Sequence, residues 1–258
     1  KQYHQKSICF VTGVPGAGKT LVGLNIANER HQYDKQEHAV FLSGNGPLVA
    51  VLREALVRDE IKRCKGKITK ITSKRKVAAF IQNIHHFRDT YLPPSEQVPA
   101  EKVTIFDEAQ RAWTKEQTAK FMLKRHVPSW NMSEPEFLIS VMDRHQDWAV
   151  IICLIGGGQE IHTGEAGLLA WFDALRNHFP HWNVYVSPQI SDVEYTQGKP
   201  LESLFMGLHL YQEKKLHLSV SLRSFRNEKV SAFVKSLLDE NLPIAQQLYS
   251  ELSLNYPI

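Results

Sequence analysis

The sequence predicts an α/β fold with a doubly wound, mostly parallel sheet and helices on both faces. Short apolar runs of strand length alternate along the chain with segments whose apolar residues recur at helical spacing. Several of these runs are continuously apolar, which is typical of strands buried on both faces. A glycine-rich turn joins the first run to the first helical segment. This alternation favours parallel strands joined by helical crossovers.

Each predicted element follows from its local pattern. Strands are predicted over residues 7–12, 39–43, 67–72, 103–107, 149–155, 182–187 and 216–222. Helices are predicted over residues 19–29, 48–57, 77–91, 133–144, 168–177 and 227–238. Ser133 is expected to cap its helix, with Pro135 in the first turn. Turn-forming residues between 188 and 200 separate a first domain, 1–190, from a second segment, 191–258.

Composition excludes several classes of protein. The chain has 258 residues, of which 43% are hydrophobic and 22% charged, so it is neither disordered nor collagen-like. No apolar run approaches the roughly 18 residues that cross a membrane, and the polar first residues do not resemble a signal peptide. Cys9, Cys64 and Cys153 lack CxxC spacing and are expected to be reduced thiols of a cytoplasmic protein.

Positive charge is concentrated in one segment, although the net charge is only +4. Residues 61–76 contain eight Lys or Arg and no Asp or Glu. On charge alone, a solvated surface is the favoured interpretation. The alternative is a local field that attracts phosphate backbones.

The glycine-rich turn matches the pattern G-x-x-x-x-G-K-[ST] and lies between a predicted strand and a predicted helix. It consists of Gly13, Val14, Pro15, Gly16, Ala17, Gly18, Lys19 and Thr20. Its backbone N–H groups and the positive end of the following helix suit a polyphosphate. Lys19 is expected to reach the β- and γ-phosphates of ATP, and the Thr20 hydroxyl to ligate Mg²⁺. The alternative is a chance glycine-rich turn.

Two acids end the predicted strand 103–107. Asp107 is expected to hold Mg²⁺, and Glu108 to polarise a water that attacks the γ-phosphate. The alternative is an exposed acidic strand end. A kinase takes its nucleophile from the substrate and has no use for Glu108, so the pair favours a hydrolytic ATPase.

Two further segments carry candidate catalytic residues. After the strand 149–155, a glycine turn is expected to bring Gln159 close to the phosphates, unless it is a plain β-turn. In the segment 221–227, Arg223 is expected to neutralise charge in the transition state, with Arg226 as the alternative. An exposed helix-cap region is the competing interpretation of that segment.

These four segments, in this order, resemble motifs I, II, III and IV of superfamily-one helicases. The narrower resemblance is to the bacterial Schlafen group III-like DNA/RNA helicase domain family. It is carried by the segments 13–20, 41–48, 107–113, 156–162 and 222–228. The resemblance implies a RecA-like P-loop motor in which ATP binds between two lobes and a nucleic-acid strand crosses them. Residues 1–190 would be the ATPase domain and residues 191–258 the truncated start of a second lobe.

The resemblance also implies contacts with a nucleic acid. Asn45 would hold phosphates of the strand, and Arg111 and Trp113 would contact or stack on nucleotides, although Trp113 is equally compatible with a packing role. The sequence departs from superfamily one at Gly157, where motif III usually has an acid. Counterparts of motifs V and VI are not found, so the rest of a longer protein is an expected partner.

The sequence therefore predicts a Mg²⁺-dependent ATPase domain of a helicase or translocase acting on single-stranded DNA or RNA, with no membrane partner. A nucleotide-dependent protein switch that moves no strand is the alternative.

Overall fold

A computed structural model gives the fold of the chain. It describes residues 4–33, 38–65, 67–127, 129–156, 165–191, 193–196, 198–221 and 228–253. Within these ranges the strands form a single sheet in the order β3-β2-β4-β5-β1-β6-β7, and β8 pairs with the end of β1. Every strand pairing in the sheet is parallel. The α/β class and the parallel sheet are therefore confirmed.

The strands are β1 (Lys6–Gly13), β2 (His38–Ser43), β3 (Ile81–Asn83), β4 (Glu101–Phe106), β5 (Ala149–Leu154), β6 (Asn183–Val186), β7 (His209–Gln212) and β8 (His217–Leu218). The helices are α1 (Lys19–Tyr33), α2 (Gly46–Arg63), α3 (Lys70–Phe80), α4 (Ile84–Thr90), α5 (Lys115–Lys124), α6 (Glu134–Asp143), α7 (Gly167–His178), α8 (Val193–Thr196), α9 (Leu201–Phe205), α10 (Glu228–Leu238) and α11 (Leu242–Leu252). Three short 3₁₀ helices are η1 (Ala109–Arg111), η2 (Pro188–Ser191) and η3 (Lys214–Leu216).

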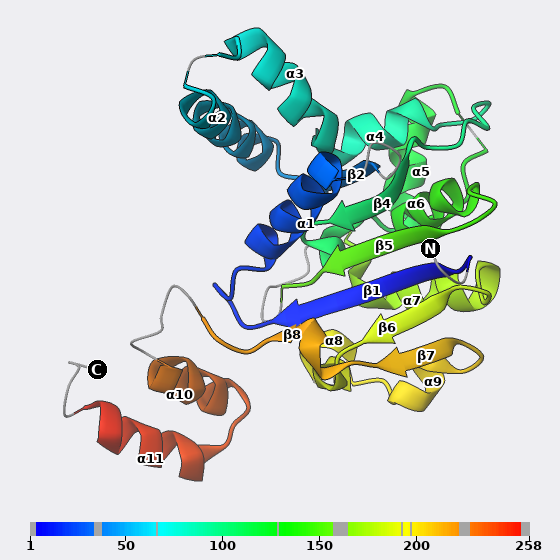
Figure 1. Cartoon of the computed structure of the whole chain (residues 1–258). Coiled ribbons are helices and arrows are strands. Elements are labelled where there is room, and N and C mark those ends of the chain that lie inside the picture. The colour runs from blue at the N-terminus through cyan, green and yellow to red at the C-terminus, as the bar shows by residue number, and fades with distance from the viewer. Residues whose placement is uncertain are drawn as a thin grey trace.

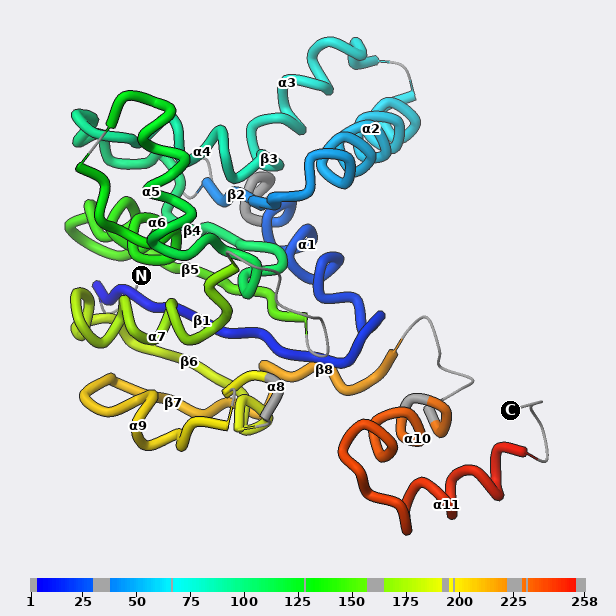
Figure 2. Tube along the Cα trace, turned by 180° about the vertical axis from the view of Figure 1, so that it is seen from behind, coloured from blue at the N-terminus to red at the C-terminus, as the bar shows by residue number. Residues whose placement is uncertain are grey.

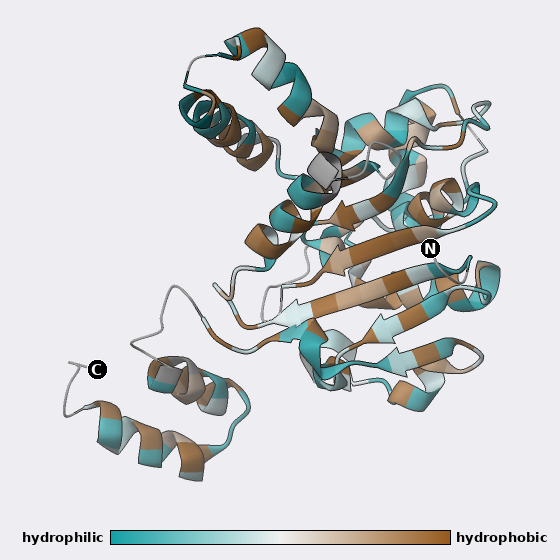
Figure 3. Ribbon diagram, in the orientation of Figure 1, coloured by the Kyte–Doolittle hydropathy of each residue, from teal (hydrophilic) through white to brown (hydrophobic). Residues whose placement is uncertain are grey.

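Helices cover both faces of the sheet. Figure 1 shows α1 in front of the sheet, and Figure 2 shows α6 and α7 on the opposite face. The central strands are strongly apolar (Figure 3), as expected for strands buried on both faces. Two hydrophobic clusters result, one under α6 and α7 and the other under α1, α2 and α3.

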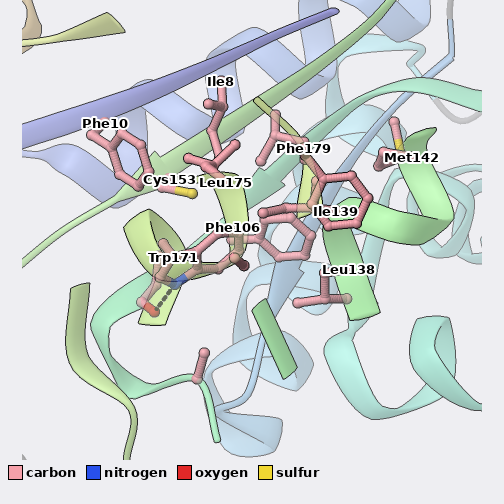
Figure 4. Close-up of a cluster of buried hydrophobic side chains, with 14 of the residues drawn as sticks. Ile8, Phe10, Phe106, Leu138, Ile139, Met142, Cys153, Trp171, Leu175 and Phe179 are labelled. Atoms are coloured by element: carbon pink, nitrogen blue, oxygen red, sulfur yellow. Dashed lines mark hydrogen bonds between the residues drawn. The ribbon is translucent and has the colours of Figure 1, made fainter. Parts of the chain in front are cut away.

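Trp171 connects the first hydrophobic cluster to the candidate site. It is fully buried on α7, and its ring centroid lies 5.5 Å from that of Phe106, the last residue of β4. Its indole N–H donates to the backbone oxygen of Ala109 at 2.9 Å (Figure 4). Because Ala109 begins η1 directly after the two acids, this contact fixes the chain that leaves β4.

The predicted strand 67–72 is wrong, and the predicted helix 77–91 is correct only for residues 77–80 and 84–90. The chain instead forms α3, the three-residue edge strand β3 and the short helix α4. Thr69 caps α3 by accepting a hydrogen bond from the Thr72 N–H at 3.2 Å. The buried residues Ser73, Val77 and Phe80 have helical spacing, but a buried serine gives no hydrophobic signal in the sequence.

The predicted strand 216–222 is also wrong in its extent, because only His217 and Leu218 form strand β8. Its pairing with the end of β1 is a long-range contact that local alternation does not reveal. Sequence patterns also missed β7, α5 and α11. Both β7 and β8 belong to the same sheet as β1, and the domain division after residue 190 stays a prediction.

Candidate functional site

The candidate site lies at the carboxyl edge of the sheet. Because the strands are parallel, the loops that follow β1, β4 and β5 leave the sheet at the same edge (Figure 1). Strand β5 lies between β1 and β4, so the chain after β5 leaves the sheet between the glycine loop and the acid pair. Ligands of open parallel sheets bind at this edge.

The glycine loop 13–20 runs from the end of β1 to the start of α1. Gly16 and Gly18 have φ values of 76° and 87°, a region that residues with a Cβ rarely adopt. Gly13 lies against β8, and a Cβ on it would be 2.8 Å from the Cβ of Leu218. The Val14 N–H donates to the Leu218 backbone oxygen at 3.0 Å. Strand β8 therefore supports the start of the loop.

Lys19 and Thr20 begin α1. The Lys19 ammonium donates to the Gly13 oxygen at 2.5 Å and to the Val14 oxygen at 3.2 Å, so it lies over the loop. The first turn of α1 has no acidic residue. The loop therefore combines a cation with the positive end of a helix, which suits an anion.

Thr20 and Asp107 bring the glycine loop and β4 together. The Thr20 hydroxyl donates to the Asp107 carboxylate, at 3.2 Å from Oδ1 and 3.4 Å from Oδ2. Asp107 is 8% exposed, and its N–H donates to the Leu42 oxygen at 2.9 Å. Burial, and next the negative charge of Glu108, raise the pKa of Asp107 to about 6. A cation beside this carboxylate would relieve both effects.

The residues present fit Mg²⁺. A hydroxyl and a carboxylate are hard oxygen ligands, and Mg²⁺ commonly takes only one or two protein groups and completes its shell with phosphates and water. Within the described residues no group of three or more His, Cys, Asp or Glu could hold a metal ion. Among the described residues the site thus offers two oxygen groups that suit a phosphate-bound Mg²⁺.

Glu108 has an unusual backbone conformation. Its φ of 52° and ψ of 48° are left-handed, which is uncommon for a residue with a Cβ and is often found at functional sites. The Gln110 amide donates to Glu108 Oε2 at 2.5 Å and accepts from the Gly156 N–H at 3.2 Å. Gln110 therefore joins the second acid to the chain that follows β5.

Six of the predicted site residues line one cavity of about 630 Å³, whereas residues 13–19 of the glycine loop are not among its lining residues. Its walls include Thr20, Asn45, Asp107, Glu108, Arg111 and Trp113. The structure thus brings together the predicted metal ligands, the predicted water-activating acid and all three candidate nucleic-acid contacts.

The three candidate contacts also have structural roles. Asn45 caps α2, and its side-chain oxygen accepts from the Leu48 N–H at 3.1 Å. An Arg111 side-chain nitrogen lies 3.9 Å from a carboxylate oxygen of Glu108, and another lies 3.9 Å from one of Glu165. Trp113 is half-buried, so part of its ring faces the cavity and part packs against the protein.

Behind Trp113 lies a buried ion pair that the sequence did not reveal. Arg88 Nη1 is 3.1 Å from Glu134 Oε1, and both side chains are nearly fully buried. The backbone N–H of Trp113 donates to Glu134 Oε2 at 3.0 Å. The Arg88 guanidinium carbon lies 4.9 Å from the centroid of the Trp113 ring. Burial lowers the pKa of Arg88 and raises the pKa of Glu134, against the attraction between them. This pair fixes the position of Trp113.

Three predicted catalytic residues lie outside the described residues: Gln159, Arg223 and its alternative Arg226. Gly157, the departure in motif III, also lies outside them. The described chain resumes on both sides of the two segments that contain these residues, at 156 and 165 and at 221 and 228. Gly156 contacts Gln110, and β8 contacts the glycine loop shortly before the segment that contains Arg223.

Two other findings bear on the sequence-based expectations. Cys9, Cys64 and Cys153 are free thiols. None of the helices in the described ranges is long and apolar enough to cross a membrane.

The sheet and its edge site define a RecA-like α/β domain of the helicase type. A family model, Schlafen group 3, DNA/RNA helicase domain, matches residues 6–258, and the chain belongs to this family. Among curated proteins none matches the chain. Among solved structures, the Pyrococcus furiosus Hef helicase domain is similar over 76% of this chain, with 14% identity and a TM-score of 0.38. The alignment spans 37% of that chain's length.

Proposed function

We propose that the domain is a Mg²⁺-dependent ATPase motor that moves along, or remodels, single-stranded DNA or RNA. One observation carries the proposal. The Thr20 hydroxyl and the Asp107 carboxylate meet beside the glycine loop, and they share a cavity with Glu108 and Trp113. A phosphate-binding loop, a metal-ligand pair, a candidate base and an aromatic surface are thus combined in one place.

In the proposed reaction, the loop N–H groups and Lys19 bind the phosphates of ATP. Thr20 and Asp107 hold Mg²⁺, which when bound withdraws charge from the phosphate oxygens. Glu108 orients the attacking water and accepts its proton, and Gln110 holds the Glu108 carboxylate in place. Gln159 would sense the γ-phosphate, and Arg223 or Arg226 would neutralise charge in the transition state.

The strand would enter the same cavity from the side of Asn45 and Trp113. Base stacking on an aromatic ring and backbone contacts from polar and cationic groups are the usual means of binding a single strand. Here Trp113 supplies the ring, Asn45 an amide and Arg111 a cation. Gln110 links Glu108 to Gly156 after the end of β5. A strand bound at the cavity wall formed by Asn45 and Trp113 would therefore influence hydrolysis through Glu108.

Nucleic-acid-stimulated ATP turnover of the full-length protein tests this proposal. We expect single-stranded DNA or RNA to raise kcat, and we expect strand binding to weaken as salt increases. Without stimulation and without salt-dependent binding, the nucleotide-dependent protein switch would be the better description.

A further inference from the structure

The basic segment 61–76 occupies the tip of a projecting helical hairpin. Helix α2 begins at the carboxyl edge of the sheet, capped by Asn45, and α3 returns toward the edge strand β3. Figures 1 and 2 show the pair projecting from the sheet beyond β3. We call residues 46–80 the basic hairpin. Its 18-residue first helix is about 27 Å long.

The positive charge of the hairpin exceeds what its own acids can neutralise. All eight basic residues of the segment 61–76 are exposed. Three of them pair with carboxylates of α2: Arg63 with Asp59, Lys70 with Glu54, and Lys76 with Glu60. The other five have no carboxylate partner within the described residues; these are Lys62, Lys65, Lys67, Lys74 and Arg75.

Helix stability does not explain this charge. Lys62 and Arg63 lie in the last turn of α2, where cations favour the helix dipole. Lys67 and Lys70, however, lie at the amino end of α3, whose first turn contains no acid. Positive charges near the amino end of a helix oppose the helix dipole, so these two lysines do not stabilise α3. Glu54 offsets that cost at Lys70, and an external anion would offset it at Lys67.

The chemistry of the surface favours a duplex as that anion. Proteins that bind single strands combine positive charge with aromatic rings on which the bases stack. Residues 46–79 contain no aromatic residue and no histidine, and Phe80 is buried. A surface with cations alone suits the phosphates of a double strand, whose bases are already stacked and whose charge density is higher.

We propose that the basic hairpin binds the phosphate backbone of double-stranded nucleic acid next to the single strand held in the cavity. This inference rests on the proposed function. Asn45 lies in the cavity wall and also caps α2, so the two surfaces are joined by one helix. The domain would thus hold both sides of a junction between single and double strands.

The test replaces four unpaired cations of the hairpin in the full-length protein. The variant carries Lys65→Gln, Lys67→Gln, Lys74→Gln and Arg75→Gln. The control removes the same charge from exposed lysines elsewhere, with Lys120→Gln, Lys124→Gln, Lys199→Gln and Lys214→Gln. Fluorescence anisotropy measures binding of a single strand, a blunt duplex and a junction with a single-stranded tail at several salt concentrations.

We expect the hairpin variant to bind the duplex and the junction at least about tenfold more weakly at low salt. The plot of log K against log salt should become less steep, with the magnitude of its slope reduced by about 3 to 4, since each lost phosphate contact contributes about 0.9. Single-strand affinity should stay within about twofold of wild type, and the control should bind all three ligands like wild type.

Two results would overturn the inference: unchanged duplex binding by the hairpin variant, or an equal loss for the single strand. Either result, with single-strand stimulation of ATP turnover intact in wild type, would leave the proposed function standing. A wild-type protein that binds neither form and shows no stimulation would contradict both, and the hairpin would then fit an acidic protein partner.

Discussion

The Thr20 hydroxyl lies 3.2 Å from Asp107 Oδ1, although 87 positions separate the two residues in the chain. The contact joins the start of α1 to the end of β4 and brings a hydroxyl and a carboxylate together beside the glycine loop. Asp107 is at the same time a buried acid with a raised pKa. A divalent cation with its bound phosphates is the partner that this arrangement suits.

Thr20→Ala should therefore weaken Mg²⁺-dependent nucleotide binding. We expect a loss of about tenfold in the affinity for a fluorescent ATP analogue in Mg²⁺, because one ligand is removed. In excess EDTA the variant and wild type should bind alike. Thr20→Ser keeps the hydroxyl and is the matched control. If Thr20→Ser lost as much affinity as Thr20→Ala, the methyl group and not the hydroxyl would matter.

Gln110 should affect turnover more than nucleotide binding. Gln110→Ala removes both of its hydrogen bonds, to Glu108 and from Gly156. Gln110→Glu keeps an acceptor for the Gly156 N–H but loses the donor to Glu108. Both variants should lower kcat about tenfold or more, with KM for ATP nearly unchanged, because Glu108 is no longer oriented. A change in KM alone would place Gln110 in nucleotide binding instead.

Removing one partner of the buried pair of Arg88 and Glu134 should lower the free energy of unfolding strongly, whereas replacing both should lower it much less. Arg88→Met leaves an unpaired buried carboxylate, and Glu134→Gln leaves the guanidinium with only the more distant Asp89, whose Oδ1 lies 3.7 Å from Arg88 Nε. Each should lower the free energy of unfolding by about 3–5 kcal/mol. The double variant should recover much of that loss in urea titrations. Additive losses would show that the two charges do not stabilise each other.

Asp143, which contacts Lys6 at the start of β1, should make the free energy of unfolding depend on pH. Burial acts to raise the pKa of Asp143, but hydrogen bonds from Lys6, His181 and Trp182 outweigh it and lower the pKa. A lowered pKa contributes stability above the unfolded value of about 4, and this contribution is lost as the pH falls through the folded value.

Asp143→Asn should accordingly cost about 1–2 kcal/mol of unfolding free energy at pH 7, and the difference from wild type should shrink below about pH 4. The control is Asp239→Asn, which removes an exposed carboxylate 3.5 Å from Lys235 and should cost less than about 0.5 kcal/mol. A difference that stays constant down to pH 3 would contradict the assignment.

The sequence predicts the glycine loop and the acid pair because each is defined by neighbouring residues. Residues 13–20 need glycines at particular positions, and Asp107 and Glu108 need only the end of an apolar strand. The partners of Glu108 could not be predicted in the same way. Gln110 reaches Gly156 only because β5 lies between β1 and β4, and sheet order is a long-range property.

Other elements were missed for related reasons. Strand β8 exists through its pairing with β1, and the buried pair of Arg88 and Glu134 joins helices 46 positions apart. The basic run 61–76 is visible in the sequence, but its placement on a projecting hairpin depends on α3, where the sequence pattern predicts a strand. A cap at Thr69 two residues after Lys67 was the local signal that favoured the helix.

Under the proposed function, Glu108 activates water beside a bound triphosphate. The most direct test is Glu108→Gln in the full-length protein, with nucleotide binding and single-strand-stimulated turnover measured on the same preparation. We predict ATP affinity within about twofold of wild type and a kcat reduced about 100-fold or more. Lys19→Ala, by contrast, should weaken nucleotide binding itself. Turnover by Glu108→Gln close to that of wild type would show that Glu108 does not activate the water.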